Sequence, residues 1–264
     1  MEKVKLQIPV GTKEWATSNV NLLFGCSHNC KYCYAKKIAI RFGRKDENSW
    51  KTMELNKSKL NYNYKKRKGR IMFPSSHDLV PEYRNECFLV LEKLLNSDNS
   101  VLITSKPHFN VIKELCDRFK KFKELIQFRF TITSTNNKIL KFWEEGAPLF
   151  EERLSSLKYA SIMRFKTSVS IEPFLDKNPI FLIEKIYPYV SETIWIGKMN
   201  YICRDPPNPD DLYYFKKVRK NYAVSNIQNI INKLSKNKKI RYKDSIKRMN
   251  VRIPKFQAPS VKNL

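Results

Sequence analysis

Apolar, β-rich runs alternate with segments of helical periodicity between about residues 17 and 200 of this 264-residue chain. A strand, helix, strand order at this spacing requires crossover connections, which place the strands parallel in one sheet. Six such units fall short of the eight in a closed barrel. We therefore predict an α/β fold, a partial (β/α)6 TIM-like barrel. Its six strands are predicted in TSNVNLLFG, RIMFP, SVLITS, FRFTITS, KTSVSIEP and TIWIGKM.

The stretches between these runs carry helical periodicity. A proline-rich break, RDPPNPDD at 204–211, precedes a last region in which helical patterns resume. We predict two parts, a barrel domain over 1–200 and a basic helical C-terminal extension over 201–264 that packs on the barrel. The predicted helices are 35–42, 81–95, 109–122, 137–143 with 151–159, and 179–187, followed in the extension by 211–220, 225–234 and 242–249.

The chain carries 51 Lys and Arg against 25 Asp and Glu, a formal net charge of +26. Such an excess attracts polyanions over a long range, so nucleic acid is the first partner to consider. The alternative is that AT-rich codons have enriched Lys, Asn and Ile throughout the chain. The charge is concentrated in the extension and in KSKLNYNYKKRKGR at 57–70. This run interleaves tyrosines with cations, which suits phosphate tracking and base stacking, or it is a solvated loop.

The N-terminal segment MEKVKLQIPVGTKEW has no apolar core of signal-peptide length. Nowhere do about eighteen apolar residues follow one another, as a membrane-spanning helix requires. We therefore predict a cytoplasmic protein without a membrane partner. In a reducing compartment, a tight group of cysteines favours metal binding or redox chemistry over disulfides.

Three of the six cysteines, Cys26, Cys30 and Cys33, form a C-x3-C-x2-C pattern in the stretch FGCSHNCKYCY. An odd number of thiols this close together suits disulfides poorly. A structural zinc normally needs a second cysteine pair, which is missing, and a fourth ligand from His28 would be cramped. Cys87 and Cys116 lie in apolar helical stretches, where a thiol is usually buried and inert.

An iron-sulfur cluster is the other metal group to consider, and zinc stays open as an alternative. A cubic cluster is ordinarily held by four thiolates, so three leave one iron open, and an open metal position is typical of a site that does chemistry. Gly25 stands where the backbone must bend tightly next to such a bulky group.

Polar residues follow each predicted strand. The carboxyl ends of parallel strands meet in one crevice, so these residues are expected to gather there, although strand ends are also polar simply because loops are solvated. All three histidines of the chain lie in these loops. The residues are the cysteine loop, 74–78, 105–108, 134–136, Ser170, Glu172, Lys198, Asn200 and Cys203.

The cysteine pattern with Tyr32 before its last cysteine, directly after a first strand and opening a partial barrel, resembles the radical S-adenosylmethionine (SAM) superfamily. The resemblance covers roughly residues 15 to 200. It implies a 4Fe-4S cluster whose open iron binds SAM, cleavage of SAM to a 5'-deoxyadenosyl radical, and an electron donor such as flavodoxin or ferredoxin. The stretches ITSKPH, ITSTNN, GAPLFEERLSSLKYA and SVSIEP are similar to the spore photoproduct lyase and DNA repair photolyase-like group.

The resemblance assigns roles to individual residues. Cys26, Cys30 and Cys33 are the expected iron ligands. The expected SAM-binding residues are Tyr32, Ser75, Ser76, Lys106, Ser134, Ser170 and Glu172.

One departure from the lyase pattern concerns the hydrogen donor. The lyase keeps a cysteine just past its second strand, where this chain reads Phe-Pro-Ser-Ser-His at 73–77. A serine O–H bond is too strong to quench a carbon radical readily. Cys203, after the sixth strand, is the candidate donor in the catalytic set, unless the reaction is a different one.

Three hypotheses follow. The first is a radical SAM enzyme that repairs or modifies a base in nucleic acid, as a lyase-like enzyme would. The second is a radical SAM enzyme acting on a peptide or small molecule, with the charge reflecting composition alone. The third is a non-catalytic nucleic-acid-binding protein with a metal-stapled loop.

Overall fold

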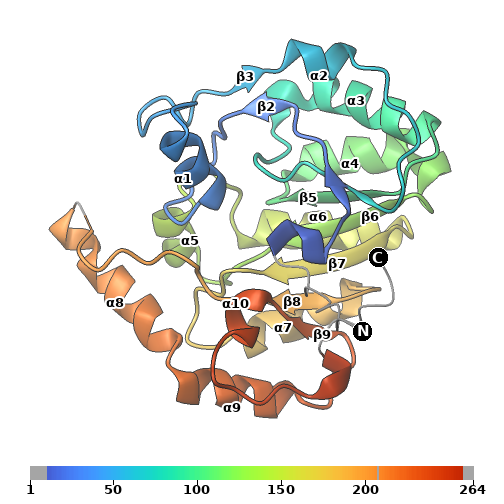
Figure 1. The fold of residues 1–264 in the computed structure, drawn as a ribbon. Helices are drawn as coiled ribbons and strands as arrows, with labels where there is room; N and C mark the ends of the chain where they lie inside the picture. Colours follow the sequence, from blue (N-terminus) through green and yellow to red (C-terminus); the bar gives the residue numbers. More distant parts are fainter. Residues whose placement is uncertain (1–10, 207, 258–264) are drawn as a thin grey trace, which may run out of the picture.

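The computed structural model describes residues 11–206 and 208–257. Within these residues, seven strands form one parallel sheet in the order β1-β4-β5-β6-β7-β8-β9 (Figure 1). Two further strands, β2 (Leu23–Phe24) and β3 (Glu54–Leu55), pair antiparallel outside it. The α/β class predicted from the alternation is confirmed. The sheet strands are β1 (Ser18–Asn19), β4 (Ile71–Phe73), β5 (Val101–Ser105), β6 (Ile126–Thr131), β7 (Lys166–Ile171), β8 (Ile194–Ile196) and β9 (Ile240–Tyr242).

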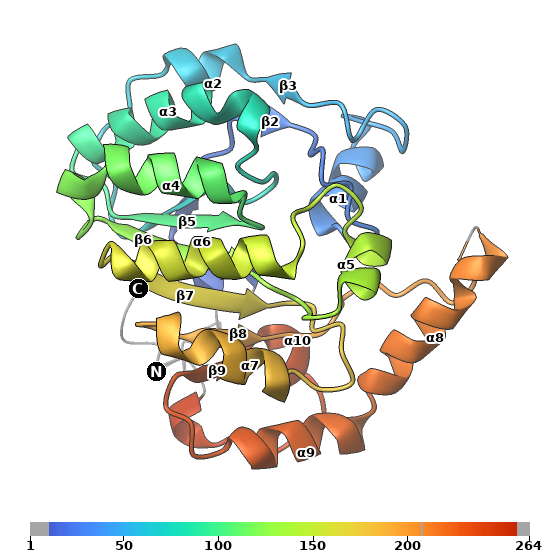
Figure 2. The ribbon, with the colours of Figure 1, turned by 180° about the vertical axis from the view of Figure 1, so that it is seen from behind.

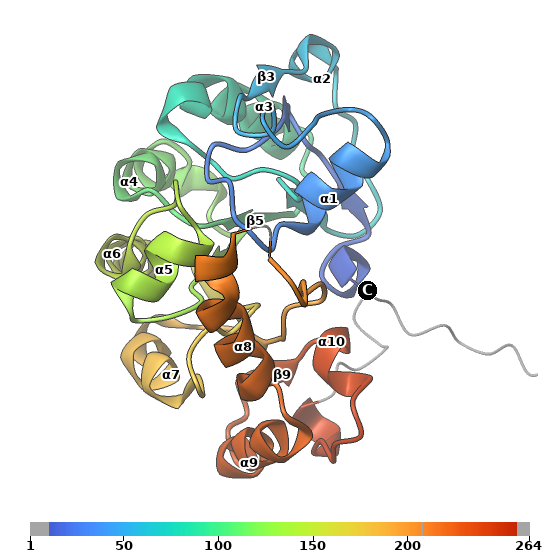
Figure 3. The ribbon, with the colours of Figure 1, turned by 90° about the vertical axis from the view of Figure 1, so that its left-hand side faces the viewer.

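The main helices follow an arc along one face of the sheet (Figure 3). They are α3 (Arg84–Asn96), α4 (Phe109–Arg118), α6 (Phe150–Ile162), α7 (Ile180–Ile186) and α9 (Val224–Leu234). Three more helices lie beyond the carboxyl ends of the strands (Figure 2): α1 (Tyr34–Arg41), α5 (Asn137–Trp143) and α8 (Leu212–Asn221). The short helices are α2 (Lys57–Asn61), α10 (Asp244–Lys247), and the 3-10 turns Gly11–Glu14, Pro81–Tyr83, Lys120–Phe122, Tyr187–Tyr189, Pro209–Asp211 and Lys255–Gln257.

The two faces of the sheet differ in chemistry because successive side chains of a strand point to opposite sides. Ile126, Phe128 and Phe130 of β6 belong to the main apolar core beneath the helices. On the other face, Arg129 lies 4.5 Å from the ring centroid of Trp15 and 5.3 Å from that of Trp195. Trp15 and Trp195 belong with Met72 and Leu102 to a second, smaller apolar cluster. Trp15 and Met72 also line a large cavity on this side of the sheet.

We predicted a purely helical C-terminal extension, but the extension also contains a strand. Helices α8 and α9 match the first two predicted helices, but Ile240–Tyr242 forms β9, which pairs in parallel with β8 through Ile194 and Ile240. Three residues are too few to show the alternating hydrophobic pattern of a strand. These residues form a strand because they pair with the edge of β8. The strand pairing therefore crosses the predicted domain boundary at residue 200, and the division at that point stays a prediction.

The basic run at 57–70 is remote from the carboxyl ends of the strands. It begins in α2, which packs on α3, and ends at Arg70, immediately before β4 at the amino end of the sheet. The Arg70 guanidinium donates to the carbonyl oxygen of Trp15 and to Gln127. None of the residues 57–70 lines the large cavity at the carboxyl ends of the strands. Among the described residues, no helix combines the length and apolarity needed to cross a bilayer.

Candidate active site

A cavity of about 570 Å³ opens at the carboxyl ends of the strands. It brings together the cysteine loop and residues that follow β4, β5, β7, β8 and β9. We call it the main cavity. Its polar and sulfur-bearing lining includes Cys26, Cys30, Tyr32, Cys33, Ser75, Ser76, Asp78, Lys106, Ser170, Glu172, Lys198, Lys243 and Asp244.

The backbone of the cysteine loop is fixed at both ends. Gly25 has φ +88°, and a Cβ there would lie 2.6 Å from the carbonyl oxygen of Trp50, so only glycine fits without strain. At the other end, Cys33 is the N-cap of α1, and its sulfur accepts a hydrogen bond from the backbone N–H of Lys36. The positive end of the α1 dipole therefore lies next to the third cysteine.

The three cysteines fit a cluster held at three corners. All three are free thiols that line the same cavity, with Cys26 and Cys30 buried and Cys33 partly exposed. Burial raises the pKa of Cys30 to about 12, while the nearby Lys106 ammonium lowers it. Because a metal binds the thiolate, a metal ion that binds here must displace the proton of this buried thiol.

Three side chains that could bind a zinc ion meet around His28, but hydrogen bonds already occupy its imidazole. The sulfur of Cys26 lies within 4.8 Å of ligand atoms of His28 and Asp78. Both imidazole nitrogens are already engaged, however: Nδ1 lies 2.8 Å from Asp78, and Nε2 lies 2.9 Å from Nε2 of His108. His28 therefore acts as a brace between loops.

Asp78 joins the cysteine loop to the loop after β5 through hydrogen bonds. It accepts hydrogen bonds from the backbone N–H of Lys106 at 2.6 Å and from the Ser105 hydroxyl at 3.1 Å. Burial alone would raise the pKa of this carboxyl, but Lys106 and His28 hold it well below its usual range. Conversely, Cys30 and Asp78 raise the pKa of Lys106 against the effect of burial. Lys106 is therefore a fixed cation facing the cavity, able to make charge-assisted hydrogen bonds.

Tyr32 is held by a buried ion pair. Its hydroxyl donates to Glu144, which also accepts from Thr133 at 2.7 Å and lies 2.5 Å from the guanidinium of Arg153. The side chains of Glu144 and Arg153 are fully buried. The Tyr32 ring lines the cavity, with the Lys106 ammonium 5.6 Å from its centroid. Its position is therefore set by α5 and α6 rather than by the cysteine loop alone.

Most of the predicted SAM-binding residues lie together. Ser75, Ser76, Ser170 and Glu172 line the main cavity with Tyr32 and Lys106. Ser134 lies outside this lining, where its hydroxyl donates to Asp176 and accepts from the backbone N–H of Asn136. Its role as a SAM contact stays a prediction.

Cys203 also lies outside the lining. It is exposed in the segment between β8 and α8, and its sulfur is 3.0 Å from the carbonyl oxygen of Asp205. Tyr201, two residues earlier, does line the cavity. The catalytic role of Cys203 therefore remains a prediction as well.

His77 is structural. Its Nε2 accepts hydrogen bonds from the backbone N–H groups of Leu22 and Leu23, and its Nδ1 is 3.0 Å from the carbonyl oxygen of Asp78. Burial lowers the pKa of His77 to about 4, which keeps the imidazole neutral as an acceptor. It ties the segment before the cysteine loop to the loop after β4.

Glu172 is expected to make stability depend on pH. Burial raises its pKa from 4.5 to about 7, Lys243 opposes the rise, and Asp244 adds to it. Because the folded-state pKa is the higher one, the favourable protonated form is lost as the pH rises through about 7. We expect Glu172→Gln, measured without SAM, to be more stable than wild type by about 1–2 kcal/mol at pH 8 and little changed at pH 5. Melting curves at the two pH values measure this, and an equal difference at both would contradict it.

The radical SAM superfamily model matches residues 20–178, more than half of the chain. The chain belongs to this superfamily, as the cysteine pattern predicts, and the 4Fe-4S cluster and SAM are therefore its cofactors. When bound, the cluster supplies the electron that cleaves SAM reductively.

Two curated relatives are similar over about two thirds of the chain. The uncharacterized protein MJ0683 of Methanocaldococcus jannaschii is 26% identical over 175 residues, 66% of this chain and 67% of that protein. The uncharacterized protein ORF301 of Acidianus two-tailed virus is 26% identical over 178 residues, 63% of this chain and 58% of that protein.

Solved structures of spore photoproduct lyase variants share the fold. Two of them superpose with TM-scores of 0.54 and 0.53 at 13% and 14% identity, covering 83% of this chain and 64% of the lyase chain in both cases. At this identity the likeness concerns the fold alone. The chain spans less than two thirds of the lyase, so a lyase activity of this chain is a proposal only.

Several residues in and around the main cavity carry no signal in the sequence that marks them as part of the site. Asp78 was noted only as polar, and its role depends on partners that lie far away along the chain. Glu144 follows a helix without any recognisable motif. Lys243 and Asp244 reach the cavity only because β9 joins the sheet. The single available signal was the alternation of Ile240 and Tyr242 with Arg241 and Lys243.

Proposed function

We propose that this chain is a radical SAM enzyme that acts on nucleic acid, repairing or modifying a base in a lyase-like reaction. Cys26, Cys30 and Cys33 hold the cluster in this proposal. Tyr32, Ser75, Ser76, Lys106, Ser134, Ser170 and Glu172 bind SAM. The observation that carries the catalytic part is the convergence of the three thiols and the fixed Lys106 cation on one cavity.

The charge around the main cavity supports a polyanionic substrate. Lys13 and Lys198 line the cavity, and neither has a carboxylate partner in the described part of the chain. The Lys37 ammonium, on α1, lies 4.9 Å from the ring centroid of Tyr201, and Arg41 on the same helix is exposed. Unpaired cations beside an exposed aromatic ring suit a nucleic acid strand, which offers phosphates and bases together.

The hydrogen donor in this proposal is Cys203. Its segment leaves β8 and passes Tyr201 at the cavity before it reaches α8. The donated hydrogen atom comes from an exposed thiol whose sulfur lies 3.0 Å from the carbonyl oxygen of Asp205. The electron that starts the reaction comes from a flavodoxin or ferredoxin. We further propose that the enzyme works in the cytoplasm and that residues 201–264 form a unit packed on the barrel.

The test uses anaerobic, cluster-loaded protein with SAM and a reductant. We expect 5'-deoxyadenosine to form, defined DNA or RNA pools to change in mass, and affinity for them to fall steeply as salt rises. Cys203→Ala is expected to keep SAM cleavage and to lose the normal product. Mass spectrometry of both the nucleoside and the nucleic acid measures these outcomes.

A different experimental result would contradict each part of the proposal. Colourless protein that binds zinc would contradict the catalytic part and support a metal-stapled binding protein. SAM cleavage without retention of DNA or RNA at moderate salt would contradict the nucleic-acid part, and a changed peptide pool would identify the other substrate class.

A further inference from the structure

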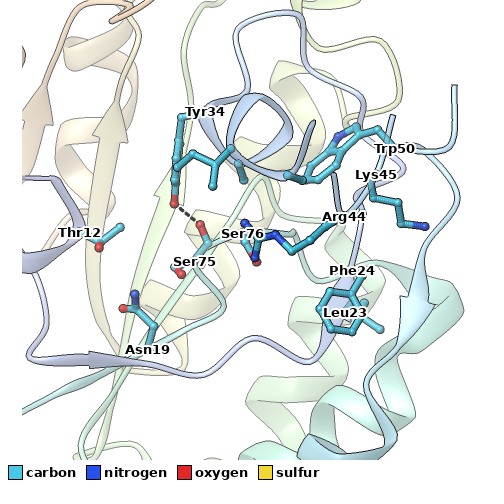
Figure 4. Close-up of a pocket in the computed structure, with 14 residues that line it drawn as sticks. Thr12, Asn19, Leu23, Phe24, Tyr34, Arg44, Lys45, Trp50, Ser75 and Ser76 are labelled. Carbon is cyan, nitrogen blue, oxygen red and sulfur yellow. Dashed lines mark hydrogen bonds between the residues drawn. The ribbon is translucent and has the colours of Figure 1, made fainter. Parts of the chain in front are cut away.

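A second, smaller pocket adjoins the main cavity. It has a volume of about 170 Å³ and lies between α1 and the strands β1 and β2 (Figure 4). We call it the side pocket. The two hollows share Tyr34, Ser75 and Ser76 in their linings, and the Tyr34 hydroxyl donates to the carbonyl oxygen of Ser75 between them. A ligand extending from one can therefore continue into the other past Tyr34.

The lining of the side pocket is suited to an anion. Its charged members are Arg44 and Lys45, and among the described residues no Asp or Glu lines it. Lys45 is engaged by Glu54 and by the carbonyl oxygen of Thr52. Arg44 is exposed, has no acidic partner among the described residues, and extends toward Ser76 in Figure 4. Its guanidinium is therefore the free cation of the pocket.

Neutral polar groups and apolar walls complete the side pocket. Asn19 and Thr12 line it, so an amide and a hydroxyl group can add hydrogen bonds to an anion that Arg44 attracts. Trp50 and the 44% exposed Phe24 supply aromatic surface. A guanidinium fork can bind two oxygens of a phosphate, and the nearby hydroxyl and amide can bind the further oxygens that a phosphate has and a carboxylate lacks.

We propose that the side pocket is a subsite for a phosphate of a polynucleotide, next to the nucleotide held in the main cavity. This inference rests on the proposed function, because it takes the substrate to be nucleic acid. Arg44 binds the phosphodiester, and Phe24 at the rim offers a face for the adjoining base. From there the nucleic acid strand runs along α1, where Lys37 and Arg41 are exposed.

The test measures binding of labelled single-stranded oligonucleotides to the cluster-loaded protein by fluorescence anisotropy. Arg44→Ala is expected to weaken binding about tenfold and to lower the slope of log affinity against log salt by about 0.7. Arg44→Lys is expected to keep the slope but to lose part of the affinity, because an ammonium is a point charge. The matched control is Arg118→Ala: Arg118 is an exposed arginine at the end of α4 paired with Glu92, and its loss should change neither quantity.

Oligonucleotide length and small competitors identify the source of the phosphate. The effect of Arg44→Ala is expected with a dinucleotide and longer strands and not with a nucleoside. If inorganic phosphate or a mononucleotide binds through Arg44 as tightly as a longer strand does, the pocket takes a free phosphate and the inference is wrong.

Two further results separate this inference from the proposed function. Wild-type protein that binds no oligonucleotide overturns both. Wild-type binding that Arg44→Ala leaves unchanged overturns the inference alone. If the same variant instead slows reduction of the cluster by reduced flavodoxin, the surface serves an acidic electron carrier, which also overturns the inference.

Discussion

Replacing Cys33 with alanine is expected to abolish both iron binding and SAM cleavage while the sheet remains folded. The site offers three thiols, and two cannot hold a cubic cluster whose fourth corner must stay open for SAM. Cys33 also caps α1 through the Lys36 N–H, so alanine should cost about 0.5–2 kcal/mol of stability besides. Iron content should fall from about four per chain to near zero.

Serine at the same position separates the two roles. Cys33→Ser keeps a side-chain acceptor for the N-cap, so we expect normal helix stability together with the loss of iron. Cys87→Ala, which removes a buried thiol on the opposite face of the sheet, should retain iron. Iron analysis, the visible spectrum and 5'-deoxyadenosine formation measure these outcomes. Nucleoside production by Cys33→Ala would refute the ligand assignment.

The second large effect is expected at Glu144. Alanine there leaves the buried Arg153 guanidinium without its carboxylate partner and removes the acceptor of Tyr32. Loss of one member of a buried ion pair costs about 3–5 kcal/mol. Urea unfolding of Glu144→Ala should therefore show a much lower free energy of unfolding, and SAM should bind more weakly because Tyr32 is no longer fixed.

Two variants control this experiment. Glu145, the next residue, is exposed and accepts a hydrogen bond from Asn29, so Glu145→Ala should change stability by less than about 0.5 kcal/mol. Adding Arg153→Met to Glu144→Ala removes the unpaired charge and should restore part of the lost stability. A Glu144→Ala protein as stable as wild type would show that the ion pair does not hold this part of the fold.

The fold was predictable because its signals are local. Apolar runs of five or six residues marked β5, β6 and β7, and the predicted helix at 137–143 coincides with α5. The cysteine spacing was equally informative, since a loop of eight residues can present its thiols to one point without help from elsewhere. Strand β9 lacked such a signal, because its partner β8 lies more than forty residues earlier.

The surroundings of the cysteines were not predictable for the same reason. His28, Asp78 and His108 meet although they come from three different loops. Glu144 and Arg153 pair across a helix connection whose path no pattern reveals. Spacing in the sequence tells which atoms could bind a metal, whereas the charges that tune those atoms depend on how distant loops meet.

The contact between Glu14 and Lys243 joins the first described turn to the residue after the last strand, and Lys247 reinforces it. More than 220 residues separate these groups, so closing this loop is entropically costly and is expected late in folding. Lys243 and Asp244 also line the main cavity. Local unfolding of β9, the edge strand of the sheet, would therefore open the main cavity on that side. Binding of a ligand in the main cavity should therefore stabilise β9 against local unfolding, and loss of β9 should weaken that binding.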